Sequence, residues 1–201
     1  MANEQQARVV RTRLKALLSA ESFVSSRGIF NRPSANGLVH VITLQLGQRS
    51  LMGSCTVNVG VFIPEVHALF NYPKQGDLWD EGFCEIRQRI GTLMPGEHDR
   101  WWPFAKDPDG VAEAITDAVS SYALPFLARF DSRSSIIASW DSLEAATPPR
   151  RDLSLALMLA ADGRRDEAFA IIERTAQSGG PHLPKLAEKV RAHVESHEAA
   201  V

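Results

Sequence analysis

The sequence has few cysteines, little net charge and no long apolar run. Only two of its 201 residues are cysteine, which excludes a disulfide-rich secreted scaffold. The net charge of −2 argues against a domain-wide positive field for nucleic acid. Because no stretch of about 18 apolar residues occurs, no membrane span is predicted. We therefore expect a cytoplasmic, globular protein that does not bind membranes. Nucleic acid is not an expected partner either.

The common signatures of catalysis are also missing. The sequence contains no phosphate-binding loop ending in Lys-Ser or Lys-Thr, no nucleophile elbow, no His-Glu-x-x-His and no Cys-x-x-Cys. Glu97, His98 and Asp99 have side chains that bind metals, but the preceding Pro95-Gly96 favours an exposed turn. We predict no catalytic residue, no metal site and no cofactor, and these absences favour a protein that is not an enzyme.

Two alternating apolar runs within residues 38–63 predict a long antiparallel hairpin around the polar segment Gly47–Ser54. If Leu46 pairs with Cys55, the even-numbered side chains of the first strand and the odd-numbered ones of the second form one apolar face. The opposite face becomes polar toward the loop, where it carries Thr43, Gln45, Thr56 and Asn58.

Other segments supply helices and further strands. Hydrophobic periodicity predicts an amphipathic helix over residues 3–20 and covering helices over 107–124 and 132–144. Alternation predicts strands over 28–32 and 83–91, the second after an irregular segment over 64–82. The sequence thus predicts an α+β fold, with a four-stranded, mainly antiparallel sheet packed against helices and followed by a short C-terminal helical appendage.

A break in the helical pattern at Thr147-Pro148-Pro149-Arg150-Arg151 predicts the domain organisation, because consecutive prolines cannot lie inside a helix. We predict an α+β core domain over residues 1–145, a Pro/Arg linker over 146–152 and a three-helix appendage over 153–201.

The first two helices of the appendage resemble a single tetratricopeptide unit. Ala156, Gly163 and Ala168 occupy places where that motif has small packing residues. Because one unit is too few for an independent solenoid, we expect the appendage to pack on the core or to mediate self-association rather than to form a peptide groove. Homo-oligomerisation through the C-terminal helices is therefore one of the predicted interactions.

Cysteine, histidine and tryptophan side chains are expected in the core. Cys55 and Cys84 lie beside apolar neighbours in different strands, so we expect reduced thiols, with a disulfide between them as the alternative. His40 interrupts the apolar face of the hairpin and is interpreted as a structural histidine with a hydrogen-bonded partner, the alternative being a catalytic base. Trp101 and Trp102 are either core residues or an interface anchor, and the core is favoured.

The polar part of the second sheet face is the candidate binding site. Cys84, Ile86 and Ile90 alternate with Glu85, Arg87 and Arg89. We therefore predict Cys84 on the same side as Ile86 and the two arginines on the other, polar face. Guanidinium groups bind carboxylates and phosphates through paired donors. The alternative is a solvated face on which the arginines pair with Glu85 and other carboxylates. The candidate binding residues are Arg32, Thr43, Gln45, Thr56, Asn58, Arg87 and Arg89.

Several short motifs follow one another in a characteristic order. They are Phe23, Arg27-Gly28, Phe30 and Arg32, then Thr56–Gly60, Cys84–Gly91, Trp101-Trp102 and Tyr122–Phe126. In this order the chain resembles the bacterial family called domain of unknown function 4304, over about residues 10–140. The resemblance implies no activity and no catalytic residues, and the C-terminal helices lie outside it.

The leading functional interpretation is a non-enzymatic bacterial interaction protein, of an immunity or accessory type. It would bind another protein through the arginine-bearing sheet face or the helical appendage. The alternative is a small enzyme or an anionic-ligand-binding protein with a cleft between the sheet and residues 64–82. In that case an Arg/Asn cluster of Arg32, Asn58, Arg87 and Arg89 would contact an anionic small molecule.

Overall fold

The computed structural model describes residues 2–70, 76–96, 98–143, 150–178 and 180–196. Its contacts group into two compact units, one made of Met1–Phe62 with Lys74–Arg129 and the other of Ile63–Pro73 with Phe130–Val201. Most of the predicted linker lies outside the described residues, and Arg150 already belongs to a helix. The domain division predicted around residues 146–152 therefore stays a prediction.

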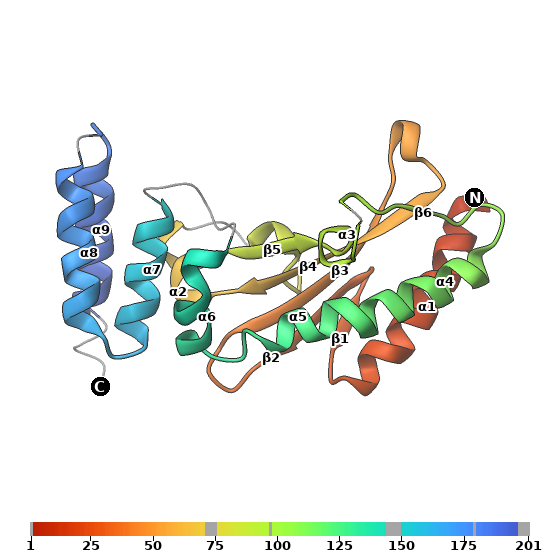
Figure 1. Cartoon of the computed structure of the whole chain (residues 1–201), viewed down its shortest axis with the longest axis horizontal. Coiled ribbons are helices and arrows are strands. Elements are labelled where there is room, and N and C mark those ends of the chain that lie inside the picture. Colours follow the sequence, from red (N-terminus) through yellow and green to blue (C-terminus); the bar gives the residue numbers. More distant parts are fainter. Residues whose placement is uncertain (1, 71–75, 97, 144–149, 179, 197–201) are drawn as a thin grey trace. The chain divides into compact units, whose positions relative to one another are not determined.

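The first unit is built on a six-stranded antiparallel sheet (Figure 1). This number corrects the prediction of four strands. The two strands that the sequence did not reveal have three and two residues, too few to show alternation. In spatial order the strands are β1 (Val24–Ser26), β2 (Ile29–Pro33), β3 (Val39–Leu46), β4 (Ser54–Phe62) and β5 (Ile86–Arg89), and β6 (Trp102–Pro103) pairs with β4.

The central hairpin has the predicted register, since Val39 pairs with Phe62 and Leu46 with Cys55. One face of the hairpin carries Ile42 and Val59, both fully buried. Figure 1 shows α1 (Ala2–Ala20) and α4 (Pro108–Ala118) lying side by side in this unit. The α4 helix begins as predicted, because the Asp107 side chain accepts a hydrogen bond from the Gly110 amide.

The chain does not leave its helical path at Leu124, where the predicted helix ended. A π-helical turn over Val119–Ala123 leads into α5 (Leu124–Ala128). Pro125, which has no N–H to donate, lies just after this π-helical turn, where the regular hydrogen-bond pattern of the helix is already interrupted.

The opposite face of the sheet is partly covered by residues 76–84. Trp79 stacks on Phe62 with ring centroids 4.0 Å apart, and the Asn31 side chain forms hydrogen bonds with both the N–H and the C=O of Trp79. Cys84 packs on Val39, Val41 and Phe62, which shows that the predicted placement of Cys84 beside Ile86 was wrong. The reason is a 3-10 turn over Glu81–Phe83, which replaces the first part of the predicted strand.

Both cysteines are free and buried, as expected for reduced core thiols. Burial raises the pKa of Cys55 to about 12 and holds that of Cys84 well above its ordinary value. Trp102 is also buried, which confirms it as a core residue, whereas Trp101 is half-buried.

Helices make up the second unit. The predicted irregular segment begins with a helix instead, because Pro64 fits the first turn of α2. The resemblance of α7 and α8 to a tetratricopeptide unit stays a prediction. The helices are α2 (Pro64–Phe70), α6 (Arg133–Ser139), α7 (Arg150–Ala161), α8 (Arg165–Gln177) and α9 (Leu183–Ser196), with a 3-10 turn over Trp140–Ser142.

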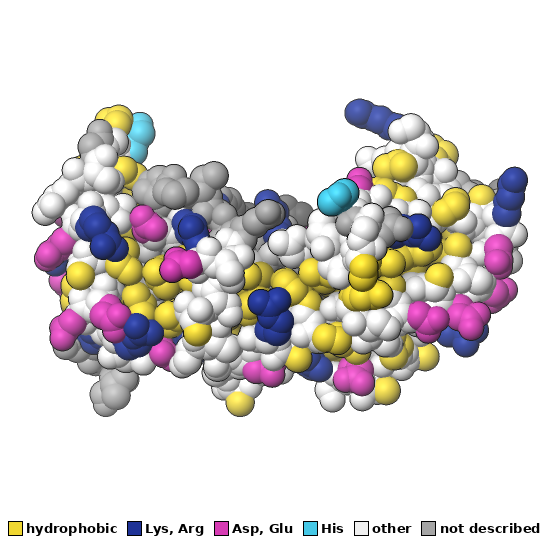
Figure 2. All heavy atoms as spheres, in the orientation of Figure 1, with side chains coloured by type: hydrophobic (Ala, Val, Ile, Leu, Met, Phe, Trp, Pro, Cys, Tyr) yellow, Lys and Arg dark blue, Asp and Glu magenta, His cyan; other side chains and the backbone are white. Residues whose placement is uncertain are grey.

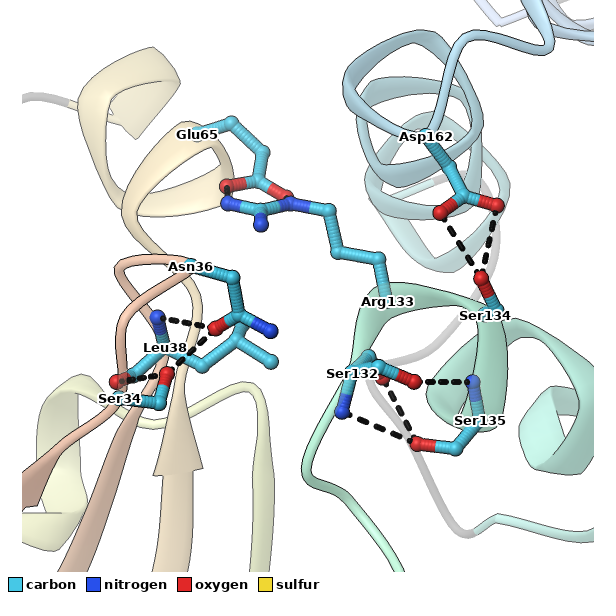
Figure 3. A network of polar contacts seen from close by, with 9 residues as sticks. All are labelled: Ser34, Asn36, Leu38, Glu65, Ser132, Arg133, Ser134, Ser135 and Asp162. Atoms are coloured by element: carbon cyan, nitrogen blue, oxygen red, sulfur yellow. Dashed lines mark hydrogen bonds and ion pairs between the residues drawn. The ribbon is translucent and has the colours of Figure 1, made fainter.

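Polar contacts fasten three of these helices to one another (Figure 3). Ser132 and Ser135 cap the start of α6 reciprocally. Between these two residues, Arg133 forms a bidentate ion pair with Glu65 of α2, with N–O distances of 2.7 and 2.8 Å. Ser134 donates a hydrogen bond to Asp162, the residue that follows α7.

The surface mixes charges of both signs. Figure 2 shows Lys and Arg side chains interspersed with Asp and Glu over the visible face. No helix in the described residues is both long enough and apolar enough to cross a membrane.

Candidate functional site

Three neighbouring strands line up polar side chains on one face of the sheet. Asn58 of β4 pairs with Arg89 of β5 on one side and with Thr43 of β3 on the other. Gln45 lies two residues beyond Thr43 in β3, so it points to the same face. These side chains line a hollow of about 440 Å³, which we call the polar pocket. Its lining is formed by Gln45, Asn58, Glu81, Arg87, Gln88, Arg89, Thr92, His98 and Asp99.

Arg89 is the centre of the hydrogen-bond network in the pocket. Its Nε donates to Oδ1 of Asn58 at 3.3 Å, and its Nη2 lies 3.5 Å from Oε1 of Gln45. Its Nη1 donates to Oδ1 of Asp99 at 2.6 Å. The guanidinium also lies over the Trp101 ring, 5.3 Å from the centroid. Contacts with β3, with β4 and with the loop that carries Asp99 therefore hold the guanidinium in one orientation.

Asn58 connects the strands with the 3-10 turn beside them. It is 7% exposed, and its Nδ2 donates to Oε1 of Gln45 and to Oε1 of Glu81, each at 2.8 Å. Both donor hydrogens of the amide have a partner in this arrangement, and its oxygen accepts from Arg89. The Glu81 carboxylate is thereby kept at the pocket, and its position depends on Asn58.

Arg87 differs from Arg89 in its surroundings. It is exposed, it lines the same pocket, and it lies opposite Gly60 in the register of β4 and β5. Among the described residues, no hydrogen bond or ion pair links its guanidinium to another side chain. The donors of Arg87 are consequently available to a bound carboxylate or phosphate.

A close backbone approach places Asp99 at the pocket. Gly91 lies in the short helix α3 (Ile90–Leu93), and a Cβ atom at this residue would come within 2.6 Å of the Arg100 nitrogen. Only glycine therefore allows the loop to pass so close to α3. This approach brings the residue before Arg100 to the guanidinium of Arg89.

The contact with Arg89 lowers the pKa of Asp99. The main cause is the hydrogen bond from Arg89, supported by the positive charge of the same guanidinium. With the folded-state pKa below its ordinary value, the ion pair contributes stability above that value and loses it as the pH falls through the lowered pKa.

We expect Arg89→Ala to raise the pKa of Asp99 back toward its ordinary value of 3.8, because the main hydrogen bond to the carboxylate is removed. An NMR titration of the Asp99 side-chain carboxyl carbon measures this change. Arg87→Ala is the matched control and should leave the titration where it is, because the Asp99 carboxylate is bonded to Arg89 and not to Arg87. Equal shifts in both variants would contradict the assigned pairing.

The structure brings four of the seven predicted site residues into the pocket: Gln45, Asn58, Arg87 and Arg89. Thr43 and Thr56 lie on the same face but do not line the hollow. Arg32 lies across from His40, so it belongs to the opposite face of the sheet. There its Nη2 lies 3.0 Å from Nδ1 of His40, which makes His40 a buried residue with a hydrogen-bonded partner, as expected.

The sequence did not reveal the acidic residues of the pocket, Glu81 and Asp99. Both lie outside the strands, where no periodicity indicates which way a side chain points. In the sequence, His98 and Asp99 stand out only as side chains of metal-binding type, together with Glu97, which lies outside the described residues. Within the part of the chain that the structure describes, no three His, Cys, Asp or Glu side chains are placed to hold a metal ion.

Comparison with known proteins gives one match. The sequence model of a family described as "Domain of unknown function (DUF4304)" matches residues 14–129. No curated protein and no solved structure matches the chain. The matched segment contains every strand found in the described residues and all the residues of the polar pocket, and it ends at Arg129, the last residue of the first unit.

Proposed function

The chain belongs to the DUF4304 family, and we propose that it is a non-enzymatic interaction protein of an immunity or accessory type, whose polar pocket binds acidic side chains of another protein. One observation carries this proposal. Arg87 and Arg89 project from one short strand into the same pocket. The donors of Arg87 have no partner among the described residues, whereas Arg89 is held in place by Gln45 and Asn58. A guanidinium that is already oriented loses less entropy when it binds a carboxylate.

The composition of the pocket favours binding over catalysis. Its side chains are mostly amides, guanidinium groups and carboxylates that are engaged with one another. Such a set can recognise a charged group through hydrogen bonds. The Thr92 hydroxyl that lines the pocket donates to Gln88 and to the Arg89 carbonyl rather than to a base, so it is not arranged as the nucleophile that covalent catalysis needs.

The second candidate is a small enzyme or a protein that binds an anionic small molecule. The volume of the hollow favours it, because about 440 Å³ falls within the range of small-molecule sites, roughly 300–1,000 Å³. Its Arg/Asn cluster would consist of Asn58, Arg87 and Arg89, without Arg32, which lies on the other face of the sheet.

Affinity capture from an extract of the native cells tests the proposal. The bait proteins are the wild type, an Arg87→Ala/Arg89→Ala variant and an Arg8→Ala/Arg13→Ala control, which removes the same charge from exposed positions of α1. Mass spectrometry should find a protein that the wild type and the control capture and that the pocket variant loses.

Other outcomes contradict the proposal in different ways. A partner that all three baits capture would exclude the pocket and direct attention to α7, α8 and α9. Absence of a partner from all three samples would favour the small-molecule candidate.

A further inference from the structure

The three nitrogen atoms of Arg89 have partners of two kinds. Nε and Nη2 face the amides of Asn58 and Gln45, which are part of the sheet. Nη1 faces Asp99, which lies in the loop between α3 and β6 and has a side chain that is 58% exposed. The sheet thus fixes the guanidinium, while an exposed carboxylate takes its remaining donor.

The contact with Asp99 is the exchangeable one. Ion pairs between exposed side chains contribute little net stability, because water and salt compete with them. When Asp99 moves away, Asn58 and Gln45 still hold Arg89, so the donor stays directed at the same place. Another carboxylate can then occupy the position that Asp99 leaves.

We infer that Asp99 is an internal competitor, which occupies Arg89 until a carboxylate of the partner replaces it. This inference rests on the proposed function. Since no described residue occupies the donors of Arg87, this side chain can bind the first acidic group, whereas the second must displace Asp99 from Arg89. The pocket therefore selects segments with two neighbouring acidic residues, since a single carboxylate gains only the contact with Arg87.

The charges of the pocket agree with this selection. Arg87 and Arg89 are opposed by Glu81 and Asp99, so the local field attracts an anion only weakly while both carboxylates stay in place. Glu81 accepts a hydrogen bond from Asn58 and is not bonded to Arg89, whereas Asp99 is. Only the removal of Asp99 therefore frees a guanidinium donor, although the removal of either residue makes the field more positive.

The test measures the affinity for a tri-glutamate peptide with blocked ends, by NMR titration of the full-length protein. Asp99→Asn keeps the shape of the side chain and removes its charge, and we expect it to bind the peptide roughly two- to fivefold more tightly than the wild type does, the range that an exposed ion pair accounts for. Glu81→Gln should give a smaller gain, and Asp117→Asn, on the exposed side of α4, should give none. In an Arg89→Ala background, Asp99→Asn should give no more than the small gain of Glu81→Gln, because only the change in the field remains.

The outcomes separate this inference from the proposed function. If Arg87→Ala/Arg89→Ala abolishes binding but Asp99→Asn leaves the affinity unchanged or lowers it, Asp99 is not a competitor and the inference is overturned while the proposed function stands. Equal gains in Asp99→Asn and Glu81→Gln would also overturn it, because the field alone would then explain them. If neither the wild type nor Asp99→Asn binds the peptide, the proposed function itself fails.

Discussion

Arg133→Ala is expected to lower the free energy of unfolding of the second unit by about 2–4 kcal/mol. The substitution removes the partner of a carboxylate that is almost out of contact with water, since the Glu65 side chain is 11% exposed and that of Arg133 is 15% exposed. An unpaired buried charge costs much more than the loss of an exposed pair, because water cannot replace the missing donors. The variant also loses the connection between α2 and α6.

Hydrogen exchange followed by mass spectrometry measures this effect locally, because it reports the protection of α2, α6 and α7 separately from that of the first unit. Arg191→Ala is the matched control. Its pair with Glu173 has an N–O distance of 3.3 Å between side chains that are 39% and 61% exposed. We expect the control to cost about 0–1 kcal/mol. Similar losses of protection in both variants would contradict the structural role of the Glu65–Arg133 pair.

Gly60→Ala is expected to lower the free energy of unfolding of the first unit by about 1–3 kcal/mol. A Cβ atom at this position would lie 2.7 Å from Cβ of Cys84 and 2.9 Å from the carbonyl oxygen of Ile86. Both atoms belong to packed parts of the sheet, so β4 and β5 would have to move apart. The polar pocket should change as well, because Arg87 lies opposite Gly60.

Urea denaturation monitored by circular dichroism gives the size of this loss. Gly82→Ala is the matched control, since its added Cβ would meet only the flexible Asp80 carboxylate, at 3.0 Å. A Gly60→Ala variant as stable as this control would show that the two strands are less closely packed than described.

The central part of the fold can be predicted from the sequence, and the reason lies in the hairpin. Its two strands are long enough to alternate over several residues, and a slip of one residue would put Ile42 and Val59 on opposite faces. The strand Val24–Ser26 and the pair Trp102–Pro103 escape detection because two or three residues cannot show a period. Tertiary pairing, rather than local pattern, makes them strands.

Site residues can be predicted from the sequence where they lie on strands with clear alternation, and not elsewhere. Asn58 and Arg89 were assigned to one face because both lie on alternating segments, and the structure makes them neighbours. Arg32 was assigned to that region without knowledge of how β2 pairs with β3, and its position opposite His40 puts it on the other face. Asp99 reaches the pocket through a loop whose path depends on the contact between Gly91 and Arg100, which no local pattern encodes.

The central claim is that the polar pocket recognises carboxylates, and side-chain NMR of the ¹⁵N-labelled protein tests it most directly. During a titration with the tri-glutamate peptide, the account predicts shifts of the side-chain amide signals of Gln45 and Asn58 and of the Nε signal of Arg89. In the Arg87→Ala/Arg89→Ala variant, which has no Arg89 signal, the side-chain amide signals of Gln45 and Asn58 should not shift. Peptide binding that leaves these signals unmoved, or that moves the amides equally in the variant, would contradict the claim.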